Sequence, residues 1–161
     1  MHVIFVEPRF PVNQREFVRG LREAGAAVSG IGESPVEALD PELKSWLVGY
    51  EQVGHEPSLL EAVRTVQKRG WVDRLEATVE AHILPVAKVR QACGIPGTTI
   101  ETAYLCRDKP SMKEALRKAG VSTAQSIGSD DPKEIRAFAQ KVGFPLIVKP
   151  RGAAGASGTS K

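Results

Sequence analysis

The 161-residue sequence predicts an α/β protein built on a small parallel sheet. Short apolar runs of strand length alternate with segments whose apolar residues recur at helical spacing, and a glycine-rich loop follows the last apolar run. Alternation of this kind favours a parallel sheet with helices on both faces. A hydrophobic content of 42% and a charged content of 25% are ordinary for a globular protein.

The first elements follow from apolar periodicity. Residues 2–6 predict a buried strand, Asn13 begins a helix that ends at Gly25, and residues 26–31 predict a second strand. The residues expected to face inward from this helix are Phe17, Val18, Leu21 and Ala24.

A capping box begins the next predicted helix. Ser58 and Glu61 have the spacing at which a serine and a glutamate satisfy each other's backbone N–H groups, and Gly70 ends the helix. Residues 71–77 predict a third strand, and residues 79–93 predict a long helix despite Pro85.

The order helix, strand, helix, strand is predicted for residues 108–149. Asp108 is an N-cap, Pro110 lies in the first turn, where its missing N–H costs nothing, and Gly120 ends the first helix. Residues 122–127 predict a short strand, the sequence Ser129-Asp130-Asp131-Pro132 opens a second helix, and the apolar run 144–148 predicts the strand that ends at Lys149.

The loop after Lys149 consists of glycines and small residues, whose backbone N–H groups can surround phosphate oxygens. A Walker A loop is excluded because the lysine precedes the glycines, and a Rossmann fingerprint is excluded because no helix can follow them. A strand, a lysine and a small-residue loop remain, which are typical of a triphosphate site. A solvent-exposed glycine-rich hairpin or a disordered terminus is the alternative. The loop residues are Gly152, Ala153, Ala154, Gly155, Ala156, Ser157 and Gly158.

Two motifs together resemble a known family. The pattern Asp108-Lys109, then Met112 and a helix ending in Ala-Gly-Val, followed by Gly-Phe-Pro-Leu-Ile-Val-Lys-Pro and a glycine-rich loop, is similar to the start of an ATP-grasp domain. The variety that it resembles is that of the carboxylate–amine ligases and biotin-carboxylase-like enzymes. The resemblance covers about residues 80–161 and implies a pre-ATP-grasp, Rossmann-like domain over residues 1–107 and an incomplete ATP-grasp domain over residues 108–161.

The resemblance also implies roles for individual residues. Lys109 and Lys149 would be the two lysines that reach the ATP phosphates, Ile147 would line the adenine side, and residues 152–158 would form the loop over the β- and γ-phosphates. Alanines at 153, 154 and 156 depart from the commonest loop and resist positive φ angles. Arg151 is predicted to be either a cation near the phosphates or a surface charge.

The implied parent enzyme would phosphorylate a small-molecule carboxylate with ATP and join it to an amine. The Mg²⁺ ligands of the family would lie beyond residue 161, and phosphoryl transfer requires such a metal. We therefore expect this chain to be an inactive N-terminal fragment. The alternatives are a non-catalytic nucleotide-binding or regulatory module and a flavodoxin-like or Rossmann-type binder, although no glycine fingerprint follows the first strand.

Composition bears on partners and location. The net charge of +3 comes from cations scattered among acids with few aromatic residues, which argues against nucleic-acid binding. The apolar run at the N-terminus is too short for a signal peptide or a membrane span, and Cys93 and Cys106 lack zinc-ligand spacing. We expect a cytoplasmic protein that has no membrane partner and no disulfide framework. Neither His55 nor His82 is assigned a catalytic role, because no partner is evident.

Overall fold

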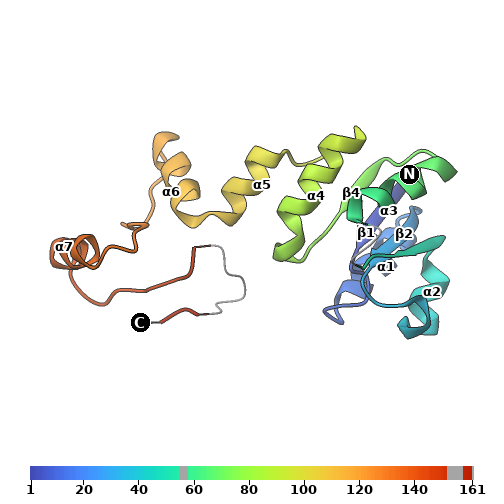
Figure 1. Ribbon diagram of the computed structural model, residues 1–161, viewed down its shortest axis with the longest axis horizontal. Coiled ribbons are helices and arrows are strands. Elements are labelled where there is room, and N and C mark those ends of the chain that lie inside the picture. The colour runs from blue at the N-terminus through green and yellow to red at the C-terminus, as the bar shows by residue number, and fades with distance from the viewer. Residues whose placement is uncertain (55–57, 152–157, 161) are drawn as a thin grey trace. The chain divides into compact units, whose positions relative to one another are not determined.

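The computed structural model describes residues 1–54, 58–151 and 158–160. It divides into two compact units, Met1–Ile100 and Glu101–Lys161. Most of the elements of both units are labelled in Figure 1.

Unit 1 contains a four-stranded sheet in the order β3-β2-β1-β4. Its strands are β1 (His2–Val6), β2 (Ala27–Gly32), β3 (Gly49–Gln52) and β4 (Arg74–Glu76). All three strand pairs are parallel, with Ile4 opposite Ser29 on β2 and Leu75 on β4. The α/β class with a small parallel sheet is therefore confirmed.

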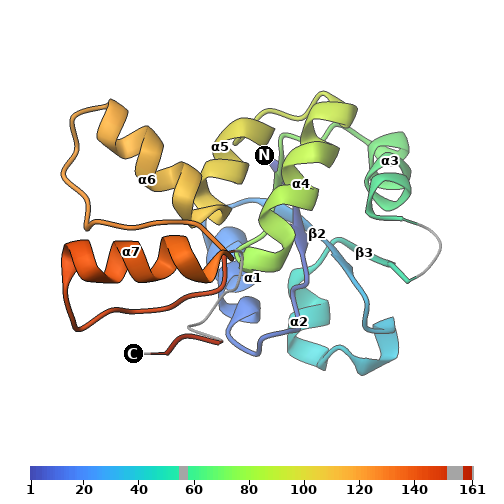
Figure 2. The same ribbon diagram turned by 60° about the vertical axis from the view of Figure 1, so that its left-hand side comes forward.

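Helices cover both faces of this sheet, and Figure 2 shows the ribbon from a second direction. The residues of β1 alternate between two cores: Val3 and Phe5 lie in one, and Ile4 and Val6 lie in the other. The first core includes Val18 from α1 and Leu43 from α2, and the second includes residues of α3 and α4. The helical elements of unit 1 are α1 (Gln14–Glu23), the short η1 (Val36–Ala38), α2 (Pro41–Trp46), α3 (Leu59–Arg69) and α4 (Glu80–Cys93).

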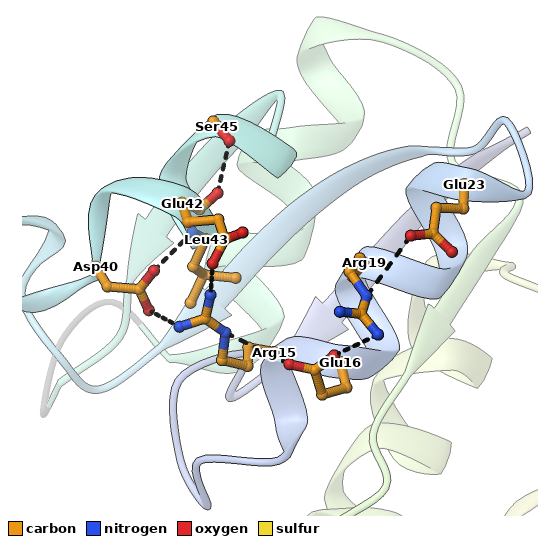
Figure 3. A network of polar contacts seen from close by, with 8 residues as sticks. All are labelled: Arg15, Glu16, Arg19, Glu23, Asp40, Glu42, Leu43 and Ser45. Atoms are coloured by element: carbon orange, nitrogen blue, oxygen red, sulfur yellow. Dashed lines mark hydrogen bonds and ion pairs between the residues drawn. The ribbon is translucent and has the colours of Figure 1, made fainter.

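A polar network joins α1 to α2 (Figure 3). The Arg15 guanidinium makes ion pairs with Asp40, at 3.0 Å, and with Glu42, and it lies over the Trp46 ring at 5.1 Å from the centroid. Asp40 also caps α2 by accepting a hydrogen bond from the Leu43 N–H. Arg15 thus links the two helices that pack on the same face of the sheet.

Several sequence predictions hold in unit 1, and others are corrected. The Ser58–Glu61 capping box is present, and α4 continues through Pro85. The strand expected over residues 71–77 is limited to β4 because only residues 74–76 pair with β1, and Trp71 is 76% exposed. The Ala24 side chain is exposed rather than inward because Ala24 is already the C-cap of α1. Strand β3 and helix α2 were not predicted.

Unit 2 is helical in its regular structure. Its helices are α5, which begins at the unit boundary (Ile100–Arg107), α6 (Lys109–Lys118) and α7 (Pro132–Val142). Asp108 caps α6 and Asp131 caps α7, as predicted for the first and consistent with the Asp-Pro start of the second. Neither α6 nor α7 contains a buried residue.

The strand predicted over residues 122–127 is wrong. This segment has no strand pairing in the described part of unit 2, and side chains of α6 hold it instead. Arg117 donates to the Thr123 and Ser126 hydroxyls, and the Lys113 ammonium donates to the Ala124 carbonyl. Gly128 lies against Pro110, where an added Cβ would be 2.8 Å from the proline Cγ.

Candidate functional site

The start of α6 is built around the Asp108 carboxylate. Its Oδ2 accepts hydrogen bonds from the Ser111 backbone N–H, at 3.1 Å, and from the Ser111 hydroxyl. These bonds satisfy part of the helix N-terminus, whose first N–H groups have no partner within the helix. Lys109 is the next residue, so its side chain originates in the first turn of the helix.

Arg151 binds the same carboxylate through two nitrogens. Its Nε donates to Oδ1 at 2.6 Å and its Nη2 donates to Oδ2 at 3.1 Å, which is the bidentate geometry that guanidinium and carboxylate groups favour. The Asp108 side chain is 9% exposed and the Arg151 side chain is 62% exposed. The residue that follows Lys149-Pro150 is therefore fastened to the N-terminus of α6.

An antiparallel β-bridge joins Val148 to Ser160. Val148 and Ser160 exchange two backbone hydrogen bonds of 2.9 and 3.0 Å. Gly158 has a φ of +66°, and an added Cβ would lie 2.8 Å from the Pro150 Cγ. A side chain at 158 would thus be strained and would clash with Pro150, so glycine is required there by geometry.

The predicted strand ending at Lys149 is corrected to this single bridge at Val148. Strand structure requires a ladder of partners, and within the described residues only Ser160 pairs with this run. Ile147 and Val148 are consequently 61% and 63% exposed.

The predicted site residues that the structure describes lie in two neighbouring segments of unit 2. The Lys109 ammonium donates to the Arg151 carbonyl oxygen at 3.4 Å, so Lys109 contacts the backbone two residues after Lys149. Lys149 is exposed, and it has no acidic partner within the described residues. The predicted loop residues Gly152, Ala153, Ala154, Gly155, Ala156 and Ser157 lie outside the described residues, whereas Gly158 lies within them.

The sequence analysis considered Asp108 and Arg151 separately and did not predict that they form an ion pair. Asp108 was predicted as an N-cap, and Arg151 was left between a phosphate-proximal and a surface role. The two residues are 43 positions apart, so no local pattern links them. Hydrogen bonds from Arg151 and Ser111 hold the pKa of Asp108 well below its usual value, and Asp108 in turn raises the pKa of Arg151.

A second polar group lies where the strands of unit 1 end, the edge at which parallel sheets bind ligands. Glu7 follows β1 and is 9% exposed, and its Oε1 accepts a hydrogen bond from the Glu33 N–H at 2.6 Å. The Tyr50 hydroxyl donates to the Ser34 carbonyl at 2.7 Å. An added Cβ at Gly32 would lie 2.8 Å from the Tyr50 hydroxyl and 3.2 Å from the Glu7 carboxylate. These groups are closely packed and connect the ends of neighbouring strands.

In residues 1–54, 58–151 and 158–160, no three His, Cys, Asp or Glu side chains are grouped so that they could hold a metal ion. Over the same residues, no helix combines the length and apolar character needed to cross a membrane.

Comparison with known proteins identifies the segment that contains this site. Residues 108–160 match the family described as carbamoyl-phosphate synthase L chain, ATP binding domain. The alanine–anticapsin ligase of Bacillus subtilis (strain 168) is 30% identical over 95 residues, which are 59% of this chain and 20% of that protein. The L-arginine-specific L-amino acid ligase of Bacillus subtilis is 34% identical over 94 residues, 58% of this chain and 23% of that protein.

The fold of this chain is also similar to that of a solved structure. The N5-carboxyaminoimidazole synthetase from Staphylococcus aureus, solved as a complex with ADP, superposes with a TM-score of 0.75 over 98% of this chain and 40% of that one, at 16% identity. This likeness concerns the fold. The chain spans about a fifth of the length of the curated ligases that it matches.

The fold and the site together define an α/β protein in which a parallel-sheet unit precedes a segment that matches an ATP-binding domain. The family match over residues 108–160 and the curated ligases to which this chain is similar are of the ATP-grasp kind. The family resemblance noted in the sequence is therefore confirmed.

Proposed function

We propose that this chain is the N-terminal part of an ATP-dependent carboxylate–amine ligase and that its unit 2 binds the phosphates of ATP. In the proposed reaction, a substrate carboxylate oxygen attacks the γ-phosphorus while the bond from that phosphorus to the β-phosphate bridging oxygen breaks, giving an acyl phosphate and ADP. The amine nitrogen then attacks the acyl carbon, phosphate leaves, and the amine loses a proton.

One observation is the main support for this proposal. The segment that matches an ATP-binding domain is also the segment in which the Lys109 ammonium contacts the Arg151 carbonyl oxygen, two residues after Lys149. Two lysines that are distant in the sequence thereby belong to neighbouring segments, and ammonium groups are common phosphate ligands. The names of the relatives, which are ligases for alanine with anticapsin and for L-arginine, support carboxylate and amine substrates.

The proposed role of each residue follows from its position. Lys109 and Lys149 would neutralise phosphate charge, Ile147 would contribute an apolar surface to the adenine, and the loop 152–158 would supply backbone N–H groups. Mg²⁺ would neutralise phosphate charge in the complete enzyme, held by ligands that we place beyond residue 161, and we propose that residues 1–161 do not turn over ATP by themselves.

Substituting Lys149 by alanine tests the phosphate site. A charge-assisted hydrogen bond contributes roughly 1.5–3 kcal/mol, so Lys149→Ala is expected to weaken ATP binding by about 10- to 100-fold. Isothermal titration calorimetry on the 161-residue chain measures this change directly. In a full-length ligase that includes this chain, the same variant should raise the KM for ATP.

Lys141→Ala is the matched control, because Lys141 is an exposed lysine in the last turn of α7. It should leave ATP affinity unchanged. Equal affinity of the Lys149→Ala variant and the wild type would show that Lys149 is a surface charge. ATP binding by the full-length protein without turnover in the presence of carboxylates and amines would favour a nucleotide-binding module.

A further inference from the structure

The Asp108–Arg151 ion pair uses the donors that Arg151 would need for a ligand. Nε and Nη2 form one edge of the guanidinium, and both donate to the Asp108 carboxylate. Asp108 lies at the start of α6, where its carboxylate also accepts two hydrogen bonds from Ser111. The carboxylate is thus held in place by the helix as well as by the arginine.

This ion pair connects the two segments that contain the lysines. On one side, Asp108 precedes Lys109, the first residue of α6. On the other side, Arg151 follows Lys149 by two residues, and its carbonyl oxygen accepts a hydrogen bond from the Lys109 ammonium. The side chain and the backbone of Arg151 therefore both contact the first residues of α6.

The Asp108 carboxylate neutralises the charge of the Arg151 guanidinium. A guanidinium paired with a well-held carboxylate has little charge left to offer a phosphate. A role in holding the backbone explains these contacts better than a role in direct phosphate contact does.

We propose that Arg151 is a positioning residue that, through Asp108, keeps Lys149 and Lys109 on the same side of the nucleotide phosphates. This inference depends on the proposed function, because it assigns Arg151 a task at that same site. In this proposal, Arg151 positions the two lysines and is not a third phosphate ligand.

Two single variants test the proposal because they break the same ion pair from opposite ends. Arg151→Met keeps the length of the side chain and removes its charge. Asp108→Asn removes the charge of the partner and keeps a residue that caps helices well. Both are expected to weaken ATP binding to the 161-residue chain by about tenfold, measured by isothermal titration calorimetry, and the double variant should be no weaker than either one.

The sign of the Asp108→Asn effect separates the two possible roles of Arg151. If Arg151 bound a phosphate itself, freeing its guanidinium would strengthen ATP binding while Arg151→Met weakened it. Opposite signs, or additive losses in the double variant, would overturn the proposal. Unchanged affinity in both single variants would overturn it as well.

Asp131→Asn provides the matched control, because Asp131 caps α7 through the Lys133 N–H and, like Asp108, precedes a proline in the first turn of its helix. It should leave ATP affinity unchanged, which would show that altered capping alone is not responsible. Circular dichroism should report equal helix content in all variants.

Hydrogen exchange without nucleotide distinguishes failure of this inference from failure of the proposed function. Loss of the ion pair should speed exchange of the Val148 and Ser160 amides, each of which donates to the carbonyl oxygen of the other residue. Faster exchange together with ATP binding that responds to Lys149→Ala but not to the Asp108 and Arg151 variants would overturn the inference alone. Absence of ATP binding by the wild type would overturn the proposed function, and the assignment of Arg151 to nucleotide binding with it.

Discussion

Glu7 has a φ of 55°, in the left-handed region that non-glycine residues seldom adopt, and its side chain is buried beneath the ends of β1 and β2. Burial raises the pKa of Glu7 above 4.5, while the hydrogen bond from the Glu33 N–H opposes this shift and the Glu33 carboxylate adds to it. The buried carboxylate is therefore easier to protonate in the folded protein than in the unfolded chain.

The sign of the resulting pH dependence follows from proton binding. Below pH 4.5 both states are protonated and the contribution of Glu7 to stability is fully present. As pH rises through the raised pKa of the folded state, the unfolded chain releases its proton first, and the free energy of unfolding falls. Glu7→Gln should remove this decrease and make the variant more stable relative to the wild type at pH 7 than at pH 4.

Urea unfolding followed by tryptophan fluorescence at pH 4, 5.5 and 7 measures this difference. Both tryptophans, Trp46 and Trp71, lie in unit 1, so the signal reports on the unit that contains Glu7. Glu16→Gln, on the exposed side of α1, is the control and should show no relative gain between pH 4 and 7. A stability difference between Glu7→Gln and the wild type that did not vary with pH would contradict the assigned role of burial.

Helix starts in this protein are determined by short polar motifs. The Ser58 hydroxyl accepts a hydrogen bond from the Glu61 N–H, and the Glu61 carboxylate accepts one from the Ser58 N–H. Asp108 and Asp131 cap α6 and α7 in the same general way. In each case the partners are two or three residues apart, which is why these starts were predicted from the sequence.

Removing the Ser58 hydroxyl tests the contribution of the cap to α3. Ser58→Ala should lower the free energy of unfolding by about 1 kcal/mol, the typical loss for an N-cap serine. Urea unfolding monitored by circular dichroism provides the measurement. Thr65→Ala, in the interior of the same helix, is the control and should cost less, because alanine favours helices more than threonine does. A loss at position 58 no larger than that at position 65 would argue against the capping box as a source of stability.

Elements that depend on distant partners were predicted less well. Strand β3 is defined by its parallel pairing with β2, and its short Gly49–Gln52 sequence has no clear alternation. Residues 122–127 were predicted to form a short strand, yet the side chains of Arg117 and Lys113 bind this segment along α6. Because a strand needs a partner with free N–H and C=O groups, composition alone does not establish one.

The two units differ in how much apolar surface they bury. Unit 1 contains two clusters of fully buried side chains, one on each face of its sheet. In unit 2, α6 and α7 contain no buried residue, and Phe144 is 83% exposed. Since burial of apolar area is the main source of stability, the backbone of unit 1 should be the harder one to open.

Native-state hydrogen exchange on the 161-residue chain tests this difference. Amides in β1, such as that of Ile4, should exchange more slowly than amides in the middle of α7 by about two orders of magnitude or more, since a few kcal/mol separates local from global opening. Amides of α3, which packs on the sheet, provide the internal comparison for a helix in unit 1. Equal protection of α3 and α7 would contradict the assignment of stability to unit 1.

The candidate site depends both on local sequence patterns and on contacts between residues that are distant in the sequence. Lys109, Lys149 and Gly158 were predicted as site residues from the sequence, because the motifs that carry the family resemblance, a capped helix and a small-residue loop, are local patterns. The contact of Lys109 with the Arg151 backbone and the pairing of Arg151 with Asp108 join positions 42 and 43 residues apart. No pattern of neighbouring residues indicates such contacts.

Amino-acid order alone was enough for the α/β class, the capped helices and the family, since each depends on residues a few positions apart or on motifs that recur among relatives. Folding in three dimensions decided that β3 joins the sheet, that residues 122–127 follow α6, and that Arg151 is bound to Asp108. The physical reason is that these features depend on which distant groups meet, and that depends on the packing of the whole chain.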